Sequence, residues 1–305
     1  MRIGIDLGGT KIEGILIAPD GHQAARTRVP TPQGDYAATV QAVADLVCDL
    51  DDAAKTLGTE TPTVGIGIPG AISPTTGLVK NANSVCLIGE ALDQDIAQAI
   101  GRDTRREVRL ANDADCFAVS EAHDGAAAGE RIVFGVILGT GVGGGIAIDG
   151  HPLSGPNAIT GEWGHNPLPW PRDDERPGPK CYCGQHGCIE TFLSGPGMRY
   201  DHYAEAGEQS EAVDIANKAA AGNADCIATM ARYEQRLARA LASVINVLDP
   251  HVIVLGGGLS NIERLYDNVP KLWDEWVFSD TVATKLVPNK HGDSSGVRGA
   301  AWLWD

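Results

Sequence analysis

The sequence predicts an α/β protein with two lobes around a cleft, and an internal repeat is the main reason. Residues 3–21 (IGIDLGGTKIEGILIAPDG) and 133–150 (VFGVILGTGVGGGIAIDG) share one pattern: a strand, a Gly/Thr turn, a second strand and a closing Asp-Gly. Two such copies favour a duplicated α/β unit. The chain has 305 residues, about two ordinary domains, and its 43% hydrophobic content is enough for real cores.

Strands and helices alternate after the first repeat. Apolar residues at helical spacing predict a helix over 35–58, and short apolar runs that end in turn residues predict buried strands at 62–70 and 107–113. A second helix is predicted over 114–129. These elements complete the α/β pattern of the first lobe.

The second half contains a long irregular insertion. Residues 151–197 are rich in Gly, Pro, Cys and Trp and show little periodicity, so something other than secondary structure must order them. A helix over 228–249 and a strand with its turn over 251–260 follow. The chain ends in a short predicted helix with a serine start, over 294–305.

No low-complexity linker marks a boundary between the lobes. We expect an N-terminal α/β domain of residues 1–117, completed by the C-terminal helix at about 292–305. We expect a larger α/β domain of residues 118–291, which carries the insertion at 151–197.

Charge and composition exclude several classes of partner. Twenty-four Lys and Arg against forty Asp and Glu give a net charge of −16, which repels nucleic acid and anionic lipid. The uncharged stretch at 132–148 has six glycines, which are poor in a membrane helix and typical of a loop between strands. No basic leader precedes the first strand, so we expect a cytoplasmic protein without nucleic-acid or membrane partners.

Three glycine turns indicate a nucleotide site. In DLGGT, Gly8, Gly9 and the Thr10 hydroxyl can bind a phosphate, and Asp6 at the strand end can orient hydrated Mg²⁺; a plain hairpin turn fits this motif equally well. GTGVGGG at 139–145 contains G-x-G-x-x-G, but a strand follows where a dinucleotide fingerprint needs a helix, and no P-loop motif occurs. With a third turn, LGGG, the hairpins predict a nucleotide in the cleft between the domains.

CYCGQHGC at 181–188 places three cysteines within eight residues. Three thiolates suit a metal that takes a fourth ligand from elsewhere, whereas a disulfide needs an even count and an oxidising compartment. Unligated surface thiols or a redox switch are the alternatives. The other cysteines lie singly in or near apolar segments and are predicted to be packing residues: Cys48, Cys86, Cys116 and Cys226.

Asp113 in RLANDAD is a candidate general base. It lies at the junction of a predicted strand and helix, where a carboxylate can accept the proton of a hydroxyl that attacks a γ-phosphate. An aspartate at this place is also a common helix N-cap, and Asp115 competes for that position. The residues alone leave both roles open.

Seven motifs occur in one order along the chain: DLGGTK, GIPG, AND, GTGVGGG, GEWGH, CYCGQHGCIE and LGGG. In this order they resemble the ROK family of sugar kinases, and most of all its bacterial fructokinase and mannokinase branch. The resemblance covers nearly the whole chain. It implies an actin-like, ribonuclease-H-like ATPase fold, ATP-dependent phosphorylation of a free hexose, and a homodimer.

The resemblance also implies a role for each motif. His165 of GEWGH is the fourth ligand, which closes a structural zinc site and pins the irregular loop. Asp113 is the catalytic base, and Mg²⁺ accompanies ATP. The metal ligands are His165, Cys181, Cys183 and Cys188. The sugar-binding residues are Asn83, Asn112, Asp113, Glu162, His165 and Glu190. The ATP-binding residues are Asp6, Gly8, Gly9, Thr10, Lys11, Thr140, Gly141, Gly143, Gly256 and Gly257.

The expected reaction is phosphorylation of the 6-hydroxyl of D-fructose, with mannose or glucose as further substrates. An N-acetylglucosamine or glucose kinase of the same family is the alternative. A sugar-responsive regulator is a distant one, because such proteins carry a helix-turn-helix before the fold, whereas the first strand here begins at residue 2. A zinc-ordered binding protein without catalysis would lack Asp113 or the glycine turns. Relatives are expected to have a tryptophan shortly after Asn83, but Cys86 stands there and puts substrate choice in doubt.

Overall fold

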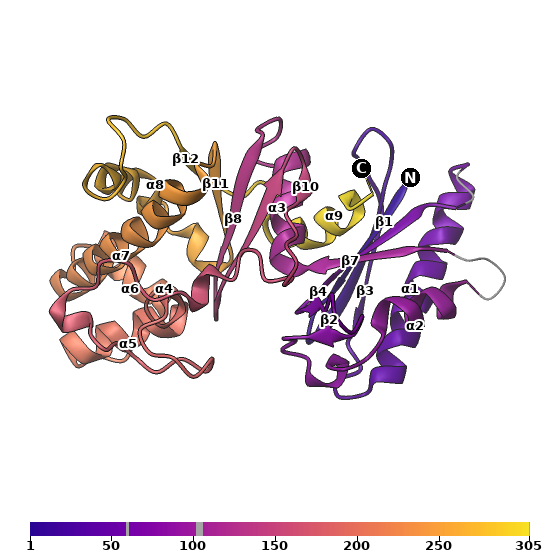
Figure 1. The fold of residues 1–305 in the computed structure, drawn as a ribbon, viewed down its shortest axis with the longest axis horizontal. Coiled ribbons are helices and arrows are strands. Elements are labelled where there is room, and N and C mark those ends of the chain that lie inside the picture. The colour runs from indigo at the N-terminus through magenta and orange to yellow at the C-terminus, as the bar shows by residue number, and fades with distance from the viewer. Residues whose placement is uncertain (59–60, 102–105, 305) are drawn as a thin grey trace. The chain divides into compact units, whose positions relative to one another are not determined.

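The computed structural model describes residues 1–58, 61–101 and 106–304. The chain forms two compact units (Figure 1). Unit 1 comprises residues 1–131, 145–160 and 293–305, and unit 2 comprises residues 132–144 and 161–292.

The unit boundary differs from the expected one. Residue 117 lies inside helix α3 (Asp113–His123), which belongs to unit 1 because it packs along the C-terminal helix α9 (Ser295–Trp302). Residues 145–160 also belong to unit 1, so the insertion predicted at 151–197 is divided between the units.

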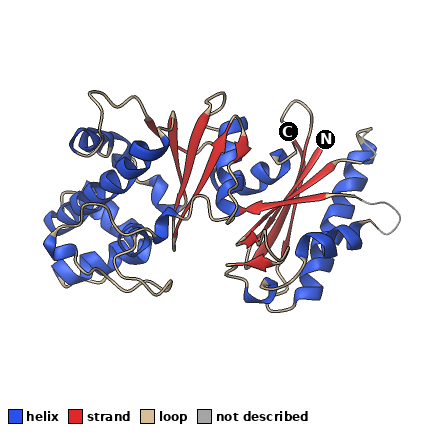
Figure 2. Cartoon of the chain, viewed as in Figure 1, coloured by secondary structure: helices blue, strands red, loops and turns tan. Residues whose placement is uncertain are grey.

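Unit 1 is built on a five-stranded sheet of order β3-β2-β1-β4-β7 (Figure 2). The first three strands are antiparallel neighbours, and β1, β4 and β7 run parallel. The strands are β1 (Arg2–Leu7), β2 (Lys11–Ile17), β3 (Gln23–Pro30), β4 (Thr63–Ile68) and β7 (Val108–Asn112), with a separate small ladder of β5 (Ala71–Ile72) and β6 (Val79–Lys80).

Alternate residues of β2 pack against helices on opposite faces of this sheet. Ile12 and Leu16 join the core formed with α1 (Tyr36–Thr56) and α2 (Leu92–Ile100), whereas Ile15 and Ile17 pack against α9. Helix α9 lies very close to the sheet: a Cβ atom at Gly65 would lie 1.8 Å from the Ala300 carbonyl oxygen. Glycines in the strands therefore let this helix dock.

The second five-stranded sheet has the order β10-β9-β8-β11-β12. Strand β11 pairs in parallel with β8 and with β12. The strands are β8 (Ile132–Leu138), β9 (Val142–Ile148), β10 (His151–Pro152), β11 (Val252–Gly256) and β12 (Lys285–Pro288). The helices of unit 2 are α4 (Ile189–Leu193), α5 (Gly195–Ala206), α6 (Ala212–Ala220), α7 (Ala224–Leu248) and α8 (Arg264–Asn268).

The predicted irregular loop is present between β10 and α4. It contains only two 3₁₀ turns, η2 (Trp163–His165) and η3 (Asp173–Glu175), besides isolated bridges such as Pro167 with Cys188. Side chains and not regular hydrogen bonding must therefore hold most of this loop.

Two of the four singly placed cysteines are buried as predicted, Cys116 and Cys226. Cys86 is half-buried, and Cys48 is exposed, so the prediction that Cys48 packs in a core is wrong. Helix α1 directs its apolar positions, such as Val47 and Leu50, into the core, and Cys48 falls on the opposite face. Among the helices of the described residues, none combines the length and the hydropathy needed to span a membrane.

Candidate functional site

The turn between β1 and β2 presents backbone N–H groups. Thr31 Oγ1 donates to the Gly8 carbonyl oxygen at 2.7 Å, and Gln33 Nε2 donates to that of Gly9 at 3.1 Å. Because the C=O and the following N–H of a trans peptide point in opposite directions, the N–H groups of Gly9 and Thr10 point away from Thr31 and Gln33. Such an array can bind a phosphate.

Asp6 lies near the end of β1, directly opposite Glu13 on β2. Burial, followed by the charges of Asp113 and Glu13, raises the pKa of Asp6 to about 6. Lys11 offsets part of this effect, with its Nζ 4.0 Å from Glu13. A carboxylate that is buried among other acids gains most from a cation, so Asp6 fits the predicted place beside Mg²⁺.

Asn112 and Asp113 lie where β7 ends and α3 begins. Asn112 is the N-cap: its Oδ1 accepts from the Ala114 N–H at 2.9 Å, and its Nδ2 donates to the Gly70 carbonyl oxygen at 3.2 Å. Asp113 is the first helical residue, and its Oδ1 accepts from the same N–H at 2.8 Å. The capping position left open for Asp113 or Asp115 thus belongs to Asn112.

Asn83 lies beside the first hairpin. It is exposed and lines a pocket of about 320 Å³ together with Gly9, Gln33 and Cys86. The sulfur-bearing side chain of Cys86 is much smaller than the tryptophan expected there, so a larger side chain at this position would reduce the pocket. The structure thus brings a predicted sugar residue and the first glycine hairpin to one cavity of unit 1.

The second glycine turn, between β8 and β9, is anchored from three sides. The Gly139 N–H donates to the Gly141 carbonyl oxygen at 3.0 Å and closes the turn. The Gly195 N–H at the start of α5 donates to the Gly139 carbonyl oxygen at 2.8 Å, and Trp163 Nε1 donates to that of Gly143 at 3.0 Å. Thr140 at the tip is exposed. This turn has the form of the first one, as the repeat predicts.

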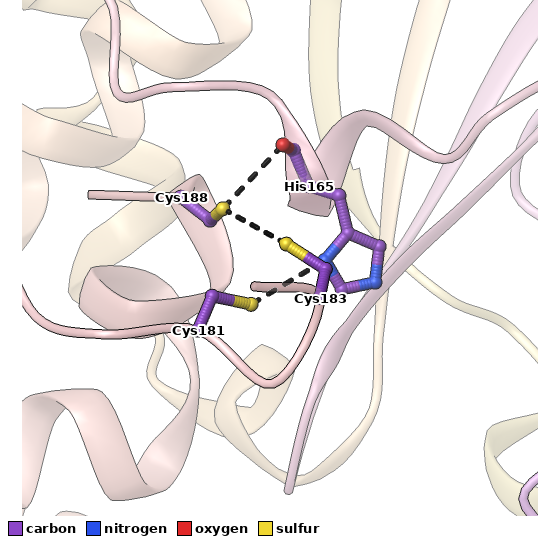
Figure 3. Close-up of side chains that lie close together, drawn as sticks. All are labelled: His165, Cys181, Cys183 and Cys188. Atoms are coloured by element: carbon purple, nitrogen blue, oxygen red, sulfur yellow. Dashed lines mark hydrogen bonds between the residues drawn. The ribbon is translucent and has the colours of Figure 1, made fainter. Parts of the chain in front are cut away.

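Four side chains of the irregular loop converge on one point (Figure 3). The ligand atoms of His165 and the three cysteines all lie within 4.8 Å of one another. Cys181 Sγ lies 3.6 Å from His165 Nδ1, and Cys183 Sγ lies 3.6 Å from Cys188 Sγ. A tetrahedral zinc site with Zn–S bonds of about 2.3 Å has S···S edges of about 3.8 Å, so the donor set fits a closed zinc site.

Both nitrogens of His165 have distinct neighbours. Nδ1 faces Cys181, and Nε2 lies 3.0 Å from the Tyr182 hydroxyl. A metal on Nδ1 would leave Nε2 as the nitrogen for a sugar hydroxyl, in place of Tyr182. Tyr182 is largely exposed, yet burial at its hydroxyl end, followed by the charges of Glu190 and, more weakly, Glu162, raises its pKa to about 12. Of the predicted sugar residues, His165 contacts Tyr182 directly, and Glu190 and Glu162 act on it through their charges.

Trp163 connects this group to the second hairpin. Its ring is buried edge-to-face against Phe134, with ring centroids 5.5 Å apart, besides its bond to Gly143. Glu162, the preceding residue, is exposed. Glu162 and His165 lie at the two ends of η2, on either side of this anchored residue and Gly164.

Glu190 lies in the first turn of α4, and its carboxylate lies on the second hairpin. Its Oε2 accepts a hydrogen bond from the Val142 N–H at 3.0 Å. Gly257, predicted to border the adenosine, has a φ of +78°, and a Cβ atom there would lie 2.4 Å from the Leu138 carbonyl oxygen. Gly256 ends strand β11 beside it. All of these residues belong to unit 2.

A buried ion network in unit 2 has no counterpart among the predicted residues. Glu175 of η3 accepts from Arg236 Nε at 2.8 Å and from Arg239 Nη2 at 2.7 Å, both on α7. Arg236 continues the network to Asp201 on α5 at 2.7 Å. The only sequence signal is an acidic run, DDE, which looks like a solvated surface.

A family model described as "ROK family" matches residues 2–305. The chain belongs to the ROK family. The predicted membership in the ROK sugar kinases is thereby confirmed. Among solved structures, the chain is 27% identical to a ROK hexokinase from Thermus thermophilus, with a TM-score of 0.85 over 99% of this chain and 97% of that one. A ROK glucokinase from Streptomyces griseus, solved with glucose and AMPPNP, is 26% identical with a TM-score of 0.76, over 99% and 98% of the two chains. These similarities confirm the predicted actin-like α/β fold.

The expectation of fructose as the substrate is wrong. The chain is 41% identical, over 99% of both proteins, to a Photobacterium profundum protein named N-acetyl-D-glucosamine kinase. A Yersinia enterocolitica protein of the same name is 39% identical over the same share. The motifs in the sequence are shared by kinases of several hexoses, and substrate choice depends on small displacements of the same polar groups.

Proposed function

We propose that the protein transfers the γ-phosphoryl group of ATP to the 6-hydroxyl of N-acetyl-D-glucosamine. The observation that carries the substrate is the full-length similarity to proteins named N-acetyl-D-glucosamine kinase, at 41% and 39% identity. The site residues support a phosphoryl transfer in general, because a carboxylate at a helix start and two glycine hairpins are the parts that this reaction needs.

Asp113 acts as the general base in this proposal. The hydrogen bond from the Ala114 N–H, 2.8 Å long, holds the carboxylate at the start of α3, and in this role the carboxylate accepts the proton of the attacking hydroxyl. Asp6 would hold the hydrated Mg²⁺ that accompanies ATP, and this cation would supply positive charge to offset the negative charge of the phosphates. The hairpins at residues 8–10 and 139–145 bind the phosphates through N–H groups, and Gly256 and Gly257 border the adenosine.

Five polar side chains bind the sugar in this proposal. They donate to or accept from its hydroxyl groups: Asn83, Asn112, Glu162, His165 and Glu190. Zinc bound by His165 and the three cysteines orders the loop that carries the glutamates and has no open position for chemistry. The homodimer and the cytoplasmic location stay predictions.

A coupled ADP-release assay tests the substrate. We expect N-acetylglucosamine to give the highest kcat/KM among N-acetylglucosamine, glucose, mannose and fructose. Asp113→Asn, prepared in parallel, should remove the activity and so exclude a contaminating kinase. A kcat/KM for any other of the four sugars that exceeds that of N-acetylglucosamine would refute the proposed substrate.

A further inference from the structure

The carboxylate of Glu190 occupies a place on the hairpin that is proposed for phosphate. Its Oε2 accepts from the Val142 N–H at 3.0 Å. The same oxygen approaches Gly141 so closely that a Cβ atom there would lie 2.7 Å from it. Only glycine at position 141 leaves room for the carboxylate in this position. A residue proposed for sugar binding thus contacts the nucleotide half of the site directly.

The backbone around Glu190 joins the same hairpin. The Ser194 N–H donates to the Glu190 carbonyl oxygen at 3.1 Å, and the adjacent Gly195 N–H donates to the Gly139 carbonyl oxygen at 2.8 Å. Helix α4 and the start of α5 therefore contact the hairpin at two points, through the Glu190 side chain and through Gly195. A movement of the Glu190 side chain would break its contact with Val142 and leave the backbone hydrogen bond between Gly195 and Gly139 intact.

When the sugar is absent, the Glu190 carboxylate and a phosphate compete for the same hairpin. A carboxylate on a hairpin N–H group satisfies that donor, and its negative charge repels a phosphate that approaches the same turn. Sugar hydroxyl groups donate hydrogen bonds to a carboxylate, so a bound sugar gives Glu190 other partners. The N–H of Val142 then becomes available to the nucleotide.

We propose that Glu190 couples the two substrates: without sugar its carboxylate blocks the second hairpin, and bound sugar draws it away and so strengthens nucleotide binding. The inference rests on the proposed function, which places the sugar at Glu190 and the phosphates on this hairpin. Such coupling would also limit ATP hydrolysis in the absence of sugar, because the phosphates would bind weakly until the acceptor is present.

The first test measures the affinity for the Mg²⁺ complex of AMPPNP by calorimetry, with and without saturating N-acetylglucosamine. For the unaltered protein we expect the sugar to tighten nucleotide binding about tenfold, within the usual range of coupling between sites. Glu190→Gln keeps the shape of the side chain and removes its charge. It should bind the nucleotide alone about fivefold or more tightly than the unaltered protein, and sugar should change that affinity little.

If Glu190 had only a structural role, Glu190→Gln would not bind the nucleotide more tightly than the unaltered protein. If Glu190→Gln binds the nucleotide alone equally or less tightly than the unaltered protein, the inference is wrong. Gly141→Ala places a methyl group where the carboxylate lies and should lower the coupling ratio towards one. Gly155→Ala is the control, because it lies outside the hairpin and a Cβ atom there would meet nothing nearer than Thr160 Oγ1 at 3.7 Å, and it should keep the ratio. Equal ratios in these two variants would also overturn the inference.

The two proposals fail in different ways. If the unaltered protein binds no N-acetylglucosamine but binds another hexose, the proposed substrate fails, and the same titrations with that hexose still decide the role of Glu190. If N-acetylglucosamine binds and is phosphorylated while nucleotide affinity does not respond to it, the coupling fails and the proposed substrate stands.

Discussion

Replacing Glu175 by Gln should destabilise unit 2 strongly, because one buried carboxylate balances two buried guanidinium groups. Glu175 is 6% exposed, and Arg239 is 1% exposed. Besides its bonds to Arg236 and Arg239 Nη2, the carboxylate accepts from Arg239 Nη1 and from the Arg172 N–H, each at 2.9 Å. The amide of glutamine is nearly the same size, but it removes the charge and offers one acceptor oxygen in place of two.

Two independent estimates agree on the magnitude. Burial alone would raise the pKa of Glu175, but the hydrogen bonds from Arg239 and Arg236 outweigh it and lower the pKa from 4.5 to about 2. A shift of this size corresponds to about 3 kcal/mol of stabilisation by the ionised form. Removal of one member of a buried ion pair costs about 3–5 kcal/mol in measured cases. We expect a loss of about 3 kcal/mol in the free energy of unfolding.

The stability difference between the unaltered protein and Glu175→Gln should depend on pH in a defined direction. Because the pKa of Glu175 is lower in the folded state than the 4.5 of the unfolded chain, its contribution is fully present above about pH 5 and is lost as the pH falls towards 2. The difference in stability between the unaltered protein and Glu175→Gln should therefore be full at pH 7 and should shrink across this acid range.

Urea unfolding at pH 7 and at pH 3.5 measures both effects. Asp174→Asn is the matched control, because it is the neighbouring acid of the same 3₁₀ turn and is exposed. We expect the control to stay within about 0.5 kcal/mol of the unaltered protein, as surface substitutions usually do. A Glu175→Gln protein as stable as the control at pH 7, or a difference that grows in acid, would refute the reasoning.

Four further predictions concern the site. Asp113→Asn should lower kcat by about 10²- to 10⁴-fold while sugar binding, measured by calorimetry, survives; near-normal kcat would rule out the base. Cys183→Ala, or exhaustive chelation, should raise the sugar KM and lower the melting temperature, and elemental analysis should find about one zinc per chain before treatment; an unchanged sugar KM in metal-free protein would contradict the zinc site. Asp6→Asn should stabilise the ligand-free protein by about 3 kcal/mol at pH 7, because the raised pKa of Asp6, about 6, makes the stability of the unaltered protein fall as the pH rises from about 4 to 6. A variant that shows the same fall would exclude Asp6 as its cause. Cys86→Trp should fill the pocket beside Asn83 and raise the sugar KM, whereas an unchanged KM would separate that pocket from the sugar site.

Short sequence motifs predicted the features of this protein that depend only on residues close together in the chain. The strand-turn-strand repeat predicted both glycine hairpins, because a turn needs only the conformational freedom of the few residues that form it. The spacing of the three cysteines predicted a metal cluster, and the resemblance to the family added His165 as its fourth member; the structure brings these four side chains together. The hexose itself was mispredicted, because kinases of different hexoses share these motifs.

Contacts between distant segments were decided by the tertiary structure alone. Asp113 and Asn112 are adjacent in the sequence, and only the start of α3 showed that Asn112 is the N-cap and that Asp113 is the first helical residue. Glu175 reads as a surface acid, and it is buried because α7 brings Arg236 and Arg239 to it from more than sixty residues away. The contact of Glu190 with Val142 spans 48 residues in the same way. The sequence by itself determined the family and the hairpins and predicted which four side chains would cluster, and these are properties of short segments. The tertiary structure decided which charges are buried and which groups touch, because burial and long-range contacts depend on how the helices pack and not on any local pattern.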